Sequence, residues 1–347
     1  MTSNSNTEIL NFAIVGTGSI AGLHLTALKD IPDIEVVALC SSSEERAAEA
    51  QTKYGINTYH DLDTMFDQEK IDAIIICTAS GQHLDPCVRA AHRGIHVLSE
   101  KPLEVTMERA QKMIDVCQEN QVKLACVFQS RFKPHYRRLK EAVDQNKLGK
   151  LLLGNAYIKW YRPKEYYSSS PWRGTLAGDG GASLINQGIH TIDLLQDVMG
   201  AVKSVTAKVK TTVHDIEGED LGVAMIEFEN GALGVIEGST AAYPGYPERL
   251  EIFGEDGSVI LEGGKIIAWN LKSDSETKQE VPSEGQDSGA SDPMAIDYAY
   301  HKYQIEDFAA AIRENRDPVV TGEEGLKALA LIRAIYESSE LDRRVEF

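Results

Sequence analysis

Two short segments of the chain hold side chains of the kind that an alcohol oxidation needs. The segment Ser99–Pro102 reads Ser-Glu-Lys-Pro and presents Lys101, and the glycine-opened segment Gly180–His190 ends in His190. Turning a secondary alcohol into a ketone requires a base for the hydroxyl proton, a cation beside the developing alkoxide and an acceptor for the hydride. We therefore expect His190 to act as the base, Lys101 as the electrostatic partner and a nicotinamide cofactor as the acceptor.

The cofactor is expected to bind near the N-terminus. A buried-type strand at 11–15 runs into Gly16–Ala21, which has the pattern G-x-G-x-x-A of a dinucleotide fingerprint and opens a helix. Gly16 permits the tight turn, Gly18 lets the backbone approach a pyrophosphate, and Ala21 lets the helix pack close to the strand. The helix N-terminus then offers N–H groups to phosphate. The predicted cofactor contacts in this turn are Gly16, Gly18, Ser19 and Ile20.

Length, charge and cysteine content narrow the class of protein. A chain of 347 residues is long enough for two domains of roughly 150 residues each. The net charge of −18 disfavours a nucleic acid or an anionic membrane as partner. The first eight residues are polar, and no segment approaches the ~20 apolar residues that span a bilayer, so we expect a cytoplasmic protein. The five cysteines lack C-x-x-C spacing, which favours buried free thiols and no metal site.

The order of apolar patterns predicts an α/β fold with two domains. Up to about residue 128, strand patterns alternate with helical ones, as in a doubly wound parallel sheet. Beyond it, several strands alternate apolar with polar residues, which predicts a large, mostly antiparallel open sheet. We therefore expect a dinucleotide-binding domain at 1–128 and an α+β domain for substrate binding and oligomerisation at 129–347. The expected strands are 34–40, 73–78, 96–98 and 123–128, then 152–161, 202–213, 222–229, 233–240, 249–253, 258–261 and 266–270. The expected helices include 43–54, 106–120, 134–146, 305–314 and 322–338, and 273–293 is expected to be a mobile loop.

Three motifs, in this order and spacing, resemble the glucose–fructose oxidoreductase / inositol dehydrogenase / rhizopine-catabolism (Gfo/Idh/MocA) family of NAD(P)-dependent sugar oxidoreductases. They are Ile14–Ala21, Ser99–Pro102 and Gly180–Asp193, and the resemblance covers nearly the whole chain. It implies a Rossmann domain, and a lysine, Lys101, beside both the nicotinamide and the substrate hydroxyl. It also implies a cis peptide bond before Pro102, and a homodimer or homotetramer formed through the exposed face of the second sheet.

The resemblance further assigns site residues at matching positions. Those that touch the cofactor in relatives match Thr78, His83, Glu100, Lys101, Gln129 and the pair Trp172-Arg173. Those that line the substrate pocket match Lys101, Arg131, Tyr161, Trp172, Asn186 and His190. Aromatic rings such as Tyr161 can stack on a sugar face, and core packing is the alternative role for each tyrosine.

One position departs from the family pattern. Relatives usually read D-x-G-x-H, whereas this chain has Asn186 four residues before His190. Asparagine can hydrogen-bond a hydroxyl but cannot carry charge or take a proton. This makes inositol oxidation less favoured and oxidation at C3 of a sugar or glycoside more favoured. On an α-helix, Asn186, His190 and Asp193 would form one polar stripe, so Asp193 is a candidate to orient His190.

The choice between NAD and NADP is weakly marked. The second strand runs into Ser41 without the acid that would hold an adenosine ribose 2′-hydroxyl. Ser41 and Arg46 are the candidate cofactor contacts at this edge, and Arg46 could reach a 2′-phosphate if the loop folds back. We expect NAD, with NADP open.

The resulting hypothesis is an NAD(P)-dependent dehydrogenase acting on a ring hydroxyl of a sugar or glycoside, in either direction. Whether Lys101 or His190 transfers the proton stays open. The alternatives are a glycosidase that retains NAD and oxidises C3 transiently, an inositol dehydrogenase, and a sugar or cofactor sensor without activity.

Overall fold

The computed structural model describes residues 8–273 and 297–347, so the loop expected at 273–293 lies, except for Ser273, outside the described residues. The chain forms two compact units. The first comprises Met1–Val127 with Tyr298–Leu326, and the second Phe128–Asp297 with Lys327–Phe347. The sequence suggested one boundary at 128 and a continuous second domain. The observed units differ from this prediction, because residues 298–326 belong to the first unit and not to the second.

The first unit contains a six-stranded parallel sheet with the order β3-β2-β1-β4-β5-β6. This is the strand order of a dinucleotide-binding fold, as the alternating pattern predicted. The strands are β1 Leu10–Val15, β2 Ile34–Cys40, β3 Thr58–Tyr59, β4 Ala73–Ile76, β5 His96–Ser99 and β6 Leu124–Cys126. The helices are α1 Ser19–Lys29, α2 Glu44–Tyr54, α3 Leu62–Gln68, α4 Leu84–Ala91, α5 Met107–Glu119 and α9 Tyr298–Glu314, with a 3₁₀ turn η1 at Ser80–Gln82.

Helix α9 belongs to the first unit because its apolar side chains complete that unit's core. Ile305 and Phe308 are fully buried in the same cluster as Phe12 of β1 and Leu25 of α1. The Phe12 and Phe308 rings meet edge to face with centroids 6.3 Å apart. Burying side chains of this size stabilises the fold by about 1.5–3 kcal/mol each, so α9 is part of the nucleotide-binding unit energetically as well as spatially.

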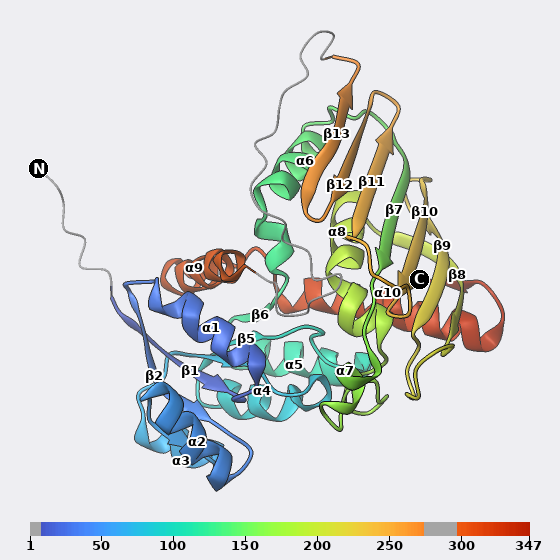
Figure 1. Cartoon of the computed structure of the whole chain (residues 1–347). Helices are drawn as coiled ribbons and strands as arrows, with labels where there is room; N and C mark the ends of the chain where they lie inside the picture. Colours follow the sequence, from blue (N-terminus) through green and yellow to red (C-terminus); the bar gives the residue numbers. More distant parts are fainter. Residues whose placement is uncertain (1–7, 274–296) are drawn as a thin grey trace, which may run out of the picture. The chain divides into compact units, whose positions relative to one another are not determined.

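The second unit contains an eight-stranded sheet with the order β13-β12-β11-β7-β10-β9-β8-β14 (Figure 1). All its strand pairs are antiparallel except β7 with β10. The strands are β7 Leu151–Lys159, β8 Val202–Lys210, β9 Leu221–Phe228, β10 Leu233–Ser239, β11 Arg249–Gly254, β12 Gly257–Glu262, β13 Lys265–Leu271 and β14 Val345–Glu346. The helical segments are η2 Gln129–Phe132, α6 Pro134–Asp144, α7 Lys164–Ser168, η3 Ser183–Gly188, α8 Ile189–Met199 and α10 Gly322–Leu341, whose first turn lies in the first unit.

The two faces of this sheet differ in what covers them. Ala224 and Ile226 of β9 and Ile236 of β10 are buried, and α8 lies against the sheet at β7 and β11. The alternate residues on the same strands include exposed apolar side chains, namely Leu153, Val223, Met225 and Leu233. Alternation therefore produces one core face and one apolar face that nothing in this chain's described residues covers.

Several short elements were not predicted from the sequence, namely β3, α3, α4, α7 and β14. Segments of this length show too few turns or alternations for a periodicity to stand out. The five cysteines are buried free thiols, as expected. Among the described residues, no helix has both the length and the apolar character needed to cross a membrane.

Candidate functional site

The glycine turn after β1 has the shape that a dinucleotide requires. Gly16 has φ +100°, and a Cβ there would lie 2.6 Å from the carbonyl oxygen of Cys77, so only glycine fits. Gly18 is exposed and is the N-cap of α1, and a Cβ built on it would meet nothing within 4 Å. The space beside Gly18 is therefore open, and a pyrophosphate could approach the first turn of α1, where Ser19 and Ile20 stand.

The end of β2 provides a polar edge beside this turn. Ser41 is buried, and its hydroxyl lies 2.8 Å from that of Thr17 in the glycine turn. Arg46, in α2, is exposed, and its guanidinium donates to the Ser42 hydroxyl at 3.3 Å. The edge thus carries hydroxyl groups and one exposed cation, and a contact of Ser41 or Arg46 with an adenosine ribose stays a prediction.

Ser99–Pro102 follows directly from the end of β5. The Lys101–Pro102 peptide bond is cis, as the resemblance implied, and Lys101 is half-buried. His83 lies behind this turn, fully buried, and its Nδ1 donates to the carbonyls of Pro102 and Leu103 at 3.0 and 3.2 Å. Burial lowers the pKa of His83. His83 thus anchors the turn, while Thr78, its expected companion, is half-buried and donates to the Gln82 carbonyl.

Glu100 is a buried anion beside Lys101. Its Oε1 lies 2.8 Å from Nε2 of His24, and its Oε2 accepts from the Lys101 backbone N–H at 3.2 Å. Burial alone would raise the pKa of Glu100, but the hydrogen bond from His24 and the charges of His24, His301 and Lys101 lower it to about 2. The carboxylate is therefore ionised at neutral pH.

The glycine-opened helix of the second unit is not α-helical throughout. Ser183–Gly188 is a π-helical turn, and α8 begins only at Ile189. The buried carboxylate of Glu219 lies beside the start of this turn. It accepts hydrogen bonds from the backbone N–H groups of Ala182 and Leu184 at 3.1 and 2.7 Å. The stripe expected from α-helical spacing is therefore wrong between Asn186 and His190, because the π turn changes the angle between successive side chains.

Asn186 lies in a buried chain of polar side chains. The guanidinium of Arg162 donates to Oε1 of Gln187 at 2.7 and 3.1 Å, and Nε2 of Gln187 donates to Oδ1 of Asn186 at 2.7 Å. Nδ2 of Asn186 donates in turn to the carboxylate of Asp179, which also accepts from the Gly174 N–H at 2.9 Å. All four side chains are buried. Two amides thus connect a buried cation to a buried anion. Each amide accepts with its oxygen from the cation's side and donates with its nitrogen toward the anion.

His190 stands half-buried at the start of α8, with its ring edge to face against Phe128 at 5.9 Å. Asp193, proposed as its support, forms a buried bidentate pair with Arg131, with N–O distances of 2.9 and 2.7 Å. Asp197 lies 3.3 Å from the same guanidinium. The Asp193 carboxylate, which was expected to orient His190, is thus bonded to Arg131. Arg131, which was expected to line the substrate pocket, is paired with two carboxylates.

The remaining predicted residues of the second unit are less buried, except Gln129. Gln129, in η2, is buried, and Tyr161 is half-buried with its ring against that of Tyr243. Trp172 is half-buried, and Arg173 stacks on Tyr166 at 4.3 Å and donates to the Ser169 hydroxyl at 2.8 Å. A cleft of about 670 Å³ opens beside Arg173, lined by parts of 164–175 and 213–217.

Sequence reasoning missed four participants: His24, Arg162, Asp179 and His301. None belongs to a motif, and each reaches its partner from a different segment of its own unit. Only the charge of Arg162 next to an aromatic run could have drawn attention, and a single buried arginine has no sequence signature.

Comparisons with known proteins agree with this architecture. Residues 10–128 match the oxidoreductase family with an NAD-binding Rossmann fold, and residues 136–260 match the GFO/IDH/MocA C-terminal domain. The chain is 28% identical to myo-inositol 2-dehydrogenase of Thermotoga maritima, over 97% of this chain and 98% of that protein. It is 27% identical to D-glucoside 3-dehydrogenase of Escherichia coli over the full length of both.

A solved structure is similar over nearly the whole length. It is the WlbA dehydrogenase from Bordetella pertussis in complex with NADH and UDP-GlcNAcA, with a TM-score of 0.87 and 30% identity over 98% of this chain and 99% of that one. Both domains, the order of the motifs and this identity agree. The chain belongs to the GFO/IDH/MocA family of NAD-binding oxidoreductases, whose members include sugar and polyol dehydrogenases.

Proposed function

We propose that this enzyme oxidises a ring secondary hydroxyl of a sugar or glycoside, at C3, to the ketone, or reduces the matching ketone. The observation that carries the proposal lies within the first unit. Gly16 follows β1 and Lys101 follows β5, so both stand at the carboxyl edge of one parallel sheet, where such sheets bind their ligands. The complex of a 30% identical relative with NADH and UDP-GlcNAcA supports a sugar substrate.

In this proposal each residue has one task. His190 takes the proton of the substrate hydroxyl, and the Lys101 ammonium stabilises the alkoxide as its charge develops. Nicotinamide, when bound, supplies the acceptor for the hydride that leaves the same carbon. The C=O bond forms as the C–H bond breaks, and in the reverse direction His190 returns the proton. Asn186, whose side-chain amide donates to Asp179 and accepts from Gln187, is the candidate residue to hydrogen-bond a substrate hydroxyl.

Inositol oxidation is the second candidate, and similarity to the Thermotoga maritima enzyme favours it. The polar chain argues against it. Where inositol-oxidising relatives are expected to present a carboxylate, this chain presents an amide that is already bonded on both sides.

A substrate panel tests the proposal. Purified protein is mixed with NAD or NADP and with glucosides, free sugars, sugar nucleotides or inositols, and NADH absorbance and released aglycone are followed together. We expect reduced cofactor to accumulate with a sugar or glycoside. Released aglycone with a flat absorbance trace would instead identify a redox-assisted glycosidase, and accumulation with inositols alone would identify an inositol dehydrogenase.

We also propose that the apolar face of the second sheet pairs with a second copy of the chain. Leu153, Val223, Met225 and Leu233 lie exposed on adjacent strands, an arrangement that a monomer in water disfavours. Light scattering should give a dimer or tetramer for the wild type and a smaller species for Met225→Glu. A wild-type monomer at micromolar concentration would refute the assignment.

A further inference from the structure

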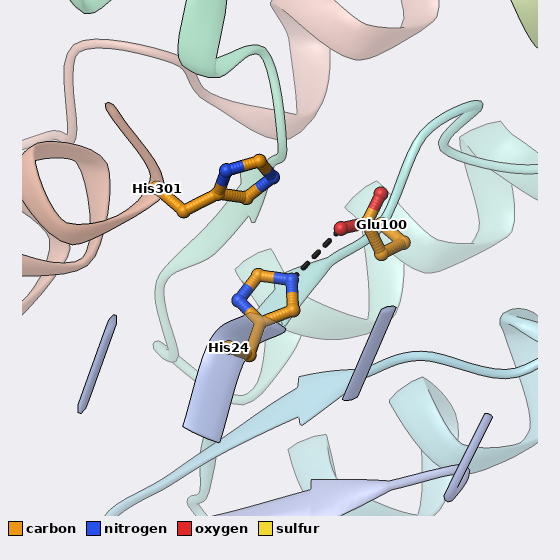
Figure 2. Close-up of side chains that lie close together, drawn as sticks. All are labelled: His24, Glu100 and His301. Carbon is orange, nitrogen blue, oxygen red and sulfur yellow. Dashed lines mark hydrogen bonds and ion pairs between the residues drawn. The ribbon is translucent and has the colours of Figure 1, made fainter. Parts of the chain in front are cut away.

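Three buried side chains from distant parts of the first unit meet behind Lys101. His24 comes from α1, Glu100 follows β5 and His301 comes from α9, and Figure 2 shows the two imidazoles and the carboxylate converging. Their exposed fractions are 1%, 6% and 2%. His24 lies 2.8 Å from Glu100, and the His24 and His301 rings meet edge to face at 5.2 Å. We call these residues the Glu100 cluster.

Several titratable groups interact with the Glu100 carboxylate. His24, His301 and Lys101 act on its carboxylate, and Glu100 acts in turn on His83 and Cys77. Burial raises the pKa of Cys77 well above its ordinary value, so this thiol stays neutral. The groups whose positive charge favours the ionised form of Glu100 include His24, His301 and Lys101.

We propose that His24 and His301 are positioning residues that keep Glu100 as a fixed anion, and that Glu100 in turn fixes Lys101 for alkoxide stabilisation. The inference rests on the function proposed above. One carboxylate oxygen faces His24 and the other accepts the Lys101 backbone N–H, so both oxygens are needed as acceptors. A protonated Glu100 would lose its charge and part of this capacity, and Lys101 would lose its neighbouring anion.

A metal ion is the competing occupant, because the three ligand atoms lie within 4.8 Å of one another. Around a tetrahedral ion with bonds of about 2 Å, two ligand atoms stand roughly 3.3 Å apart. The His24–Glu100 separation of 2.8 Å is shorter and is that of a charge-assisted hydrogen bond. The geometry therefore favours a proton between these groups.

Kinetics of four variants test the proposal with the substrate that the panel identifies. His24→Leu removes donor and charge, and His24→Gln keeps a donor without charge. We expect His24→Leu to lower kcat about 10- to 100-fold, with KM and NADH affinity near wild type, and to move the acid limb of the pH profile upward. His24→Gln should lie between. In a Glu100→Gln background, His24→Leu should add no further loss.

A matched control is His92→Leu, an exposed histidine just after α4, which should leave kcat and the pH profile unchanged. A His24→Leu protein with a lower melting temperature but an unchanged pH profile would overturn the proposal, since that result indicates a structural role alone. So would one zinc ion per purified chain that is lost in His301→Leu.

Infrared difference spectroscopy provides a readout that needs no substrate. At neutral pH, His24→Leu should show the carbonyl stretch of a protonated carboxyl group, which is absent from the wild type and from the His24→Leu, Glu100→Gln double variant. Absence of this band in His24→Leu would overturn the inference. If no panel compound is oxidised, the proposed function fails, while the infrared result still decides the state of Glu100.

Discussion

The two units each bury a carboxylate near a candidate catalytic residue, and they compensate its charge in different ways. Glu100 lies directly against His24, with His301 beside it. Asp179 accepts from Asn186, Asn186 accepts from Gln187, and Gln187 accepts from Arg162. The first arrangement places two histidines around the carboxylate, whereas the second contains two amides, which do not titrate.

This difference accounts for the residue at 186. An asparagine can donate to Asp179 and accept from Gln187 at the same time, which is what the chain of hydrogen bonds requires. An aspartate could only accept, and it would stand against a second buried carboxylate. The asparagine that departs from the family's D-x-G-x-H pattern therefore fits its surroundings, because Gln187 donates to it and Asp179 accepts from it.

We expect the largest loss of activity when the candidate catalytic residue of either unit, Lys101 or His190, is replaced. Lys101→Met and His190→Ala should each lower kcat roughly 10²–10⁴-fold, because each removes a group that we propose acts on the reacting hydroxyl. NADH fluorescence titration should show that the cofactor still binds. Lys112→Met, an exposed lysine on α5, is the matched control. Full activity in either variant would refute the role assigned to that residue.

Asn186→Asp should break the second arrangement alone. Placing two carboxylates in contact within a buried site should lower the free energy of unfolding by about 2–4 kcal/mol, measured with urea. The loss should be larger at pH 8 than at pH 5, since one carboxyl can take up a proton at the lower pH. Exchanging the two residues, as Asn186→Asp with Asp179→Asn, should recover much of the stability. An unaltered unfolding free energy in the single variant would contradict the polar chain.

Glu100→Gln should change how the free energy of unfolding depends on pH. The folded pKa of Glu100 is lowered from 4.5 to about 2, so its ionisation contributes stability above pH 4.5, and this contribution disappears as the pH falls toward 2. We expect the wild type to exceed Glu100→Gln by on the order of 2 kcal/mol at pH 6, and the gap to close near pH 2. Equal pH dependence in both proteins would show that Glu100 is not a stabilised anion.

The smallest effect is expected at the exposed edge of the first unit. Arg46→Ala should raise KM for NADP about three- to ten-fold by removing a cation near the adenosine ribose, and leave KM for NAD unchanged. Steady-state kinetics with both cofactors measure this, and thermal unfolding should show no shift. Equal changes with both cofactors would exclude a contact between Arg46 and a 2′-phosphate.

Elements with clear patterns were predictable from the sequence. The strand expected at 34–40 matches β2 at both ends, and the glycine turn and the cis-proline turn occur where their motifs predicted them. These features depend on neighbouring residues. The polar chain and the Glu100 cluster depend on pairs such as His24 with Glu100 and Asn186 with Asp179, which meet only after folding. The π-helical turn at Ser183–Gly188 likewise has no periodic signal that separates it from an α-helix.

The fate of one hydrogen atom shows whether the enzyme oxidises its substrate at C3. The best substrate from the panel is prepared with deuterium at C3 and, separately, at its other ring carbons, and the mass of the reduced cofactor is measured after turnover. We expect deuterium in the cofactor from the C3-labelled compound alone. Label arriving from another carbon, or no reduced cofactor with any sugar or glycoside, would contradict it.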